Sequence, residues 1–122
     1  MAYAGIQTML LAYKMQKCDK EFELMQISND LTRATKQMGE VSESFEEVKS
    51  GLDKDDPDYE AQIDALDDEY NNQLAEIAAW EDELQQKESN CNTQISLLSG
   101  YIESWQSALQ TNVAKAHTYG AQ

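Results

Sequence analysis

Acidic side chains crowd one short segment, and they are the first residues whose type and spacing suggest chemistry. Aspartate or glutamate occupies five of the eight positions from 53 to 60. Alternating carboxylates of this kind are typical of a calcium-binding loop. The EF-hand pattern needs an Asx residue at its fifth position and glycine at its sixth, but Pro57 and Asp58 stand there. We interpret the run as a solvated acidic turn and predict no metal ligand.

The remaining residues that could support catalysis lack suitable partners. The one histidine, His117, has no serine, cysteine or carboxylate at a spacing typical of a catalytic triad. Pairs of carboxylates that could catalyse hydrolysis are easy to choose among 23 Asp+Glu, but such a pair indicates an active site only where it lines a pocket. The sequence therefore predicts no catalytic residue and no cofactor, and we expect that the chain is not an enzyme.

Charge and cysteine content narrow the possible partners and compartments. The net charge of -14 opposes binding to nucleic acid or to an anionic membrane. No uncharged stretch reaches the roughly 20 apolar residues of a membrane-spanning helix. Cys18 and Cys91 are too few for a disulfide framework; two buried thiols are the simpler expectation, and an intrachain bridge is the alternative. We expect a cytoplasmic protein, or one exported without a cleaved signal peptide.

A heptad pattern predicts a first long helix over about residues 3–52. From Leu24 onward, apolar residues hold every first and fourth heptad position for about four heptads, which is typical of a coiled coil. Upstream, Lys17 and Lys20 interrupt the same seam. The predicted seam residues of this helix are Leu24, Ile27, Leu31, Met38, Val41, Phe45 and Val48.

A helix stop followed at once by a helix start predicts a tight turn at about residues 53–57. Gly51 suits the position after a helix, and Pro57 suits the first turn of the next one, with Asp55 or Asp56 as the N-cap. A second helix is predicted over about 58–116, with a frayed tail at 117–122, and Gly100 is expected to mark a bend or a close helix–helix approach. Its seam residues are Ile63, Leu66, Tyr70, Ile77, Trp80, Leu84, Leu98 and Trp105.

These elements predict an all-α fold in which residues 1–122 form a single domain. The fold class is a long antiparallel two-helix hairpin or coiled coil with a short acidic turn. Because a hairpin buries only one side of each helix, we expect oligomerisation to complete it.

Charge is distributed unevenly along this hairpin. Residues 1–38 hold five bases and four acids, a net +1; residues 39–90 hold three bases and eighteen acids, a net -15; residues 91–122 hold one of each. Electrostatic repulsion is therefore concentrated in the segment around the turn. The near-neutral ends are the part that we expect to pack against another molecule.

A second apolar face on the first helix supports this expectation. Five residues recur at alternating spacings of four and three, on the face away from the seam, and we call them the outer stripe: Leu11, Met15, Cys18, Phe22 and Met25. A helix that is apolar on two faces is normally buried on two sides. The C-terminal tail could fold back onto the outer stripe, but an intermolecular contact is favoured because the chain has no spare element of the right length.

Two kinds of function fit this arrangement. The layout resembles that of bacterial secretion needle and filament subunits, which are small helical hairpins whose termini pack in the assembly. We therefore predict a structural subunit that associates with copies of itself. The alternative is an adaptor, chaperone or regulator whose outer stripe binds a heterologous amphipathic helix. The exported WXG100 hairpins carry Trp-x-Gly at their turn, where this chain has Lys-Ser-Gly-Leu. This difference counts against membership of the chain in that family.

Overall fold

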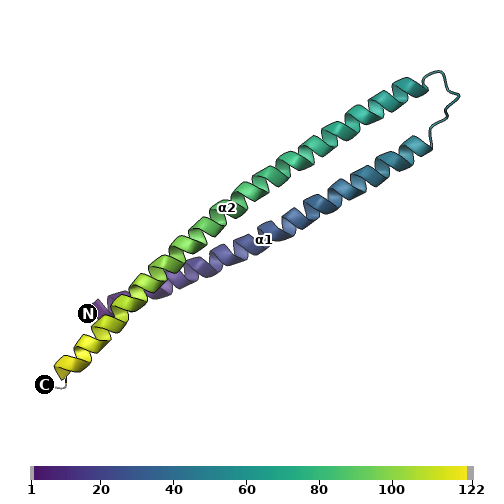
Figure 1. The fold of residues 1–122 in the computed structure, drawn as a ribbon. Helices are drawn as coiled ribbons and strands as arrows, with labels where there is room; N and C mark the ends of the chain where they lie inside the picture. Colours follow the sequence, from purple (N-terminus) through teal and green to yellow (C-terminus); the bar gives the residue numbers. More distant parts are fainter. Residues whose placement is uncertain (1, 121–122) are drawn as a thin grey trace. The chain divides into compact units, whose positions relative to one another are not determined.

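The computed structural model describes residues 2–120, with side chains over 4–115, and consists of two helices joined by a loop (Figure 1). Helix α1 spans Ala2–Ser50 and helix α2 spans Tyr59–Gly120. The two helices pack against each other in antiparallel directions, and the described residues contain no strand. The predicted all-α helical hairpin is confirmed.

The loop between the helices has the capping chemistry that its aspartates and proline predict. The N–H of Gly51 donates to the carbonyls of Glu47 and Val48 at 3.2 and 3.1 Å and ends α1. The carboxylate of Asp56 accepts from the N–H of Asp58 at 2.9 Å, and the carbonyl of Asp56 accepts from Tyr59. Asp56 therefore caps the turn that leads into α2, with Pro57 directly after it, and the carbonyl of Asp58 accepts the first helical bond from the N–H of Gln62 at 2.9 Å.

Both ends of the predicted helices differ from the observed bounds by a few residues. The first helix stops at Ser50, two residues before the predicted end, and α2 begins at Tyr59 instead of 58. The backbone of α2 stays helical to Gly120, so the predicted frayed tail is helical over residues 117–120. Each added residue of a helix gains one backbone hydrogen bond, and no proline interrupts this segment. Residues 121–122 lie outside the described part of the chain.

The chain divides into two compact units, each built from a part of both helices. Residues 27–87 form one unit, which we call the turn unit, and residues 1–26 with 88–122 form the other, the terminal unit. The statement that residues 1–122 form a single domain stays a prediction. Each unit is described by itself below.

Polar and aromatic side chains connect the helices within the turn unit. Lys49 of α1 forms an ion pair with Asp67 of α2, and this hydrogen bond raises the pKa of Lys49 above its ordinary value of 10.5. The hydroxyls of Ser42 and Tyr70 lie 2.8 Å apart, and the rings of Phe45 and Tyr70 have centroids 5.1 Å apart. Ile27, Ala34 and Leu84 are the buried apolar residues that this unit contributes.

An apolar cluster connects the helices within the terminal unit. Ile6 and Leu10 of α1 pack with Ile102 of α2, and each of these side chains is less than 10% exposed. Tyr13, Trp105, Ala108 and Leu109 pack around the cluster. Burial of this apolar area is the main contribution that holds the two helical segments of the unit together.

The structure differs from the expectations for Val48 and for Gly100. Val48 was predicted in the seam but is 50% exposed, because an α-helix advances by 3.6 residues per turn and the neighbouring Lys49 faces α2 instead. At Gly100 the expected close helix–helix approach is wrong, since a Cβ built there meets no atom within 4 Å, and the alternative of a bend stays a prediction.

The other predicted seam residues of the two helices are buried or half-buried. In α2 the buried positions change from the first and fourth to the first and fifth of the heptad, so that Cys91, Leu98 and Ile102 are buried while Tyr101 is 48% exposed. The half-buried seam residues are Leu24, Leu31, Met38, Val41, Phe45, Ile63, Leu66, Tyr70, Ile77, Trp80 and Trp105.

Candidate functional site

The outer stripe is the largest exposed apolar feature of α1 and lies in the terminal unit. Leu11 and Met15 are each 61% exposed, and Phe22 and Met25 are each 60% exposed. Cys18 is exposed between them. Exposed apolar side chains are ordinary when scattered singly, but five along one helix face form a contiguous surface.

The position of the outer stripe follows from the rotation of successive helix residues. Each residue of an α-helix turns by about 100°, so residues spaced by four and three fall on one face. The same segment of α1 buries Leu10 and half-buries Tyr13 and Leu24 against α2. These residues precede the stripe residues by one or two positions and therefore lie on a different face, which leaves the outer stripe in solvent.

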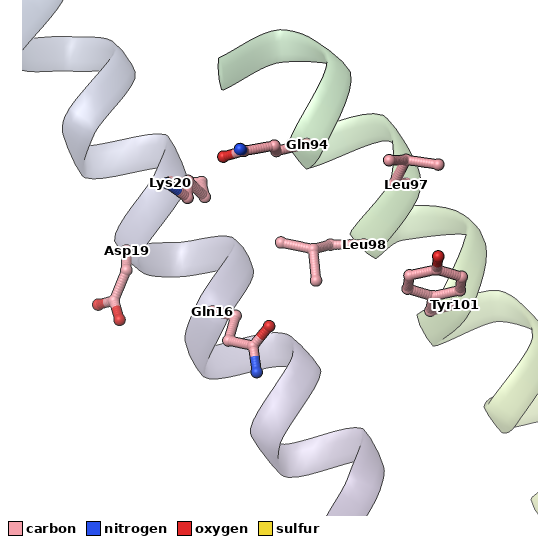
Figure 2. A pocket seen from close by; sticks show the side chains of 7 residues that line it. All are labelled: Gln16, Asp19, Lys20, Gln94, Leu97, Leu98 and Tyr101. Atoms are coloured by element: carbon pink, nitrogen blue, oxygen red, sulfur yellow. The ribbon is translucent and has the colours of Figure 1, made fainter. Parts of the chain in front are cut away.

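A groove between α1 and α2 is a second surface of the terminal unit. It has a volume of about 320 Å³ and is open to solvent. Figure 2 shows Leu98 pointing from α2 toward the space between the helices, and Gln94 pointing toward Lys20. Leu97 and Tyr101, 53% and 48% exposed, border it from α2. No residue of the outer stripe lines this groove, so the terminal unit has two separate surfaces with apolar side chains.

The two cysteines have different surroundings in the structure and are not bridged. Cys91 is 3% exposed and its thiol donates a hydrogen bond to the backbone carbonyl of Lys20 at 3.0 Å. Burial raises the pKa of the Cys91 thiol, and the nearby carboxylate of Glu23 raises it further. Cys18 is exposed on the outer stripe. The expectation of two buried thiols is therefore wrong for Cys18, because this residue lies away from the seam.

The acidic turn uses its carboxylates to bind its own backbone. Asp53 accepts from the N–H of Asp55 at 3.0 Å, and Asp56 accepts from that of Asp58 at 2.9 Å. Among the described residues, no group of three or more His, Cys, Asp or Glu side chains is arranged to hold a metal ion. The side chain of His117 lies outside the described residues.

Two residues of the groove were not singled out by the sequence pattern. Tyr101 falls on a fourth heptad position and Leu97 on a position next to the seam, so the heptad assigned neither to a surface site. The sequence did contain a signal for this surface, since Leu97 and Tyr101 are large apolar residues four apart on one helix face. The ring of Tyr101 also packs against Tyr13 of α1, with centroids 5.4 Å apart.

Comparisons with known proteins add no relative from which a function could be transferred. No protein-family model, no curated protein and no solved structure matches this chain. Within the described residues, neither helix has a segment long and apolar enough to cross a membrane. The surfaces of the chain itself are therefore the basis for a functional proposal.

Proposed function

We propose that this chain is a structural subunit that self-assembles through its terminal unit, as a coiled-coil filament or needle subunit does. The observation that carries the proposal is the outer stripe, whose four largest side chains are 60–61% exposed on one helix face. Covering these side chains would remove apolar area from water, which favours association without any specific ligand.

The charge of the terminal unit supports a second copy of the chain as the partner. Residues 1–26 and 88–122 together hold four Lys+Arg and five Asp+Glu, a net charge of -1. Two terminal units can therefore approach each other with little net repulsion. A net charge near zero promotes association of like molecules.

Growth beyond a dimer needs a second contact surface, and the terminal unit has one. A contact that uses the same patch on both subunits closes on itself, while two different patches permit an open assembly. Besides the outer stripe, the groove bordered by Leu97 and Tyr101 presents exposed apolar side chains on α2. The pair of surfaces fits a filament subunit better than a protein with a single docking site.

Analytical ultracentrifugation of the wild type and of the double variant Phe22→Ser/Met25→Ser tests the proposal. We expect the wild type to associate as its concentration rises. The double variant should dissociate with a constant at least about twentyfold higher, because the exposed parts of two apolar side chains no longer contribute to the contact. Val48→Ser is the matched control, since Val48 is 50% exposed but lies in the turn unit, and it should behave as the wild type.

Three results would contradict self-assembly through the outer stripe. A wild type that stays monomeric at all concentrations would exclude it and leave the heterologous amphipathic helix as the partner to seek. An unchanged dissociation constant in the double variant would move the contact elsewhere. Loss of helical circular dichroism in the double variant would show that the outer stripe is covered within the chain.

A further inference from the structure

We infer that the outer stripe pairs with the outer stripe of a second copy in antiparallel orientation, about a two-fold axis that passes close to Cys18. The inference rests on the proposed self-assembly and adds to it the orientation and register of the contact. Its support comes from the spacing of the stripe, the charges beside it and the charge of the turn unit.

The outer stripe is nearly symmetric in sequence about its central residue. Leu11 and Met15 lie seven and three residues before Cys18, and Phe22 and Met25 lie four and seven residues after it. A two-fold rotation at Cys18 therefore sets Leu11 of one copy against Met25 of the other. It also sets Met15 of one copy against Phe22 of the other. The alternation of four and three is the spacing that packs one helix into the holes of another.

The charges beside the stripe are compatible with this arrangement. Lys14 and Glu21 directly precede Met15 and Phe22, so they flank the outer stripe on the same side and both are exposed. When Met15 of one copy faces Phe22 of the other, Lys14 faces Glu21, and the two-fold axis repeats the pair. On the opposite flank, Asp19 of one copy faces Asp19 of the other, which makes one pair of like charge. Two pairs of opposite charge thus outnumber one pair of like charge.

The acidic turn unit decides between antiparallel and parallel pairing. A parallel pair would also bring opposite charges together, Lys14 of one copy with Asp19 of the other, so the flanks alone do not choose. Each chain enters its turn unit at residue 27, just beyond Met25. That unit holds five Lys+Arg and eighteen Asp+Glu, a net charge of -13. In a parallel pair both chains leave the contact for their turn units at the same end, whereas in an antiparallel pair they leave it at opposite ends, which lowers the repulsion between the acidic residues that follow.

Site-directed crosslinking tests the orientation. In a background of Cys18→Ser/Cys91→Ser, one variant carries Leu11→Cys and a second carries Met25→Cys. After treatment with a short bismaleimide, the equimolar mixture should give at least fivefold more crosslinked dimer than either variant alone. The matched control is Val48→Cys in the same background, which should give no crosslinked dimer above the level of free collision. Ultracentrifugation of each variant establishes that it still associates.

Each result separates the orientation from the proposed function. Crosslinks of Leu11→Cys with itself and of Met25→Cys with itself, with no excess in the mixture, would mean parallel pairing; self-assembly would then stand and the inference would be wrong. Association without any crosslink would place the contact away from the outer stripe. Absence of association in the wild type would reject the proposed function itself.

Discussion

The two units of the chain have the same length and the same kind of helical seam, but their surfaces differ. Each comprises 61 residues, yet the terminal unit has a net charge of -1 and the turn unit a net charge of -13. Among the described residues, eight of the nine large apolar side chains with high exposure belong to the terminal unit, and Val48 alone belongs to the turn unit. The surface of the terminal unit is thus suited to association, and the surface of the turn unit is suited to contact with water.

The difference extends to the contacts that hold each unit together. The terminal unit relies on an apolar cluster around Ile6, Leu10 and Ile102. The turn unit also buries Ile27, Ala34 and Leu84, but polar groups of Ser42, Lys49 and Tyr70 join its helices as well. Screening by salt weakens repulsion among exposed charges but does not weaken apolar burial. The two units should therefore respond differently to the same perturbation.

The largest expected difference between the units concerns their cores. Ile102→Ala removes a side chain that is 9% exposed from the apolar cluster, and we expect a loss of about 2–4 kcal/mol in the free energy of unfolding. Ile77→Ala in the turn unit removes a half-buried side chain and should cost about 1–2 kcal/mol. Urea denaturation followed by circular dichroism measures both. Equal losses would mean that the half-buried Ile77 contributes as much to stability as the buried Ile102.

A second expected effect is the repair of the interrupted seam in the terminal unit. The side chains of Lys17 and Lys20 are 35% and 34% exposed and occupy seam positions between apolar residues. Replacing both by leucine should stabilise the chain by about 1–2 kcal/mol in total, since more apolar area is buried and only weak exposed ion pairs are lost. Thermal melting measures the change. Lys36→Leu, at a side chain that is 77% exposed, is the control and should leave the melting temperature unchanged.

The elements of the fold were predictable because local chemistry determines them. The heptads of α1, the capping aspartate and Pro57 act within a few residues, and apart from the exposed Val48 each has a counterpart in the structure. The rotation of α2 about its own axis depends on packing against α1, and the heptad could not supply it. For this reason the groove beside Tyr101 was not predicted. The exposure of Val48 was missed for a different reason, since the 3.6-residue turn of α1 drifts away from a seven-residue repeat. The outer stripe was predictable as a pattern, but its partner is a property of another molecule.

Raising the salt concentration should stabilise the turn unit more than the terminal unit, by about 1 kcal/mol. Raising ionic strength from 0.01 to 1 M shortens the Debye length from about 30 Å to about 3 Å, which weakens repulsion among the eighteen acids of the turn unit. Amide hydrogen exchange should therefore slow about fivefold more in residues 27–87 than in the terminal unit. The Phe22→Ser/Met25→Ser variant is the appropriate chain, because association would otherwise protect the terminal unit. Equal slowing in both units would mean that the repulsion does not act locally.

The smallest expected effect is a difference in how alkaline pH lowers the stability of the two units. Burial raises the pKa of Cys91 in the terminal unit above its ordinary value of 9.0, so the folded chain holds the thiol proton more tightly than the unfolded chain does. The unfolded thiol ionises first, and stability falls as the pH rises from about 9 through the folded pKa. The pKa of Lys49 in the turn unit is raised from 10.5, so its contribution is lost only at still higher pH.

Substitution of Cys91 isolates this effect. Cys91→Ser keeps a hydroxyl that can donate to the carbonyl of Lys20 but removes the group that titrates near pH 9. Between pH 8 and pH 10, the free energy of unfolding should therefore fall more in the wild type than in Cys91→Ser, as measured by urea denaturation. Cys18→Ser removes an exposed thiol and should follow the wild type across the range. If all three chains decline in parallel, Cys91 is not held away from solvent, and the packing of α1 against α2 in the terminal unit is looser than the structure indicates.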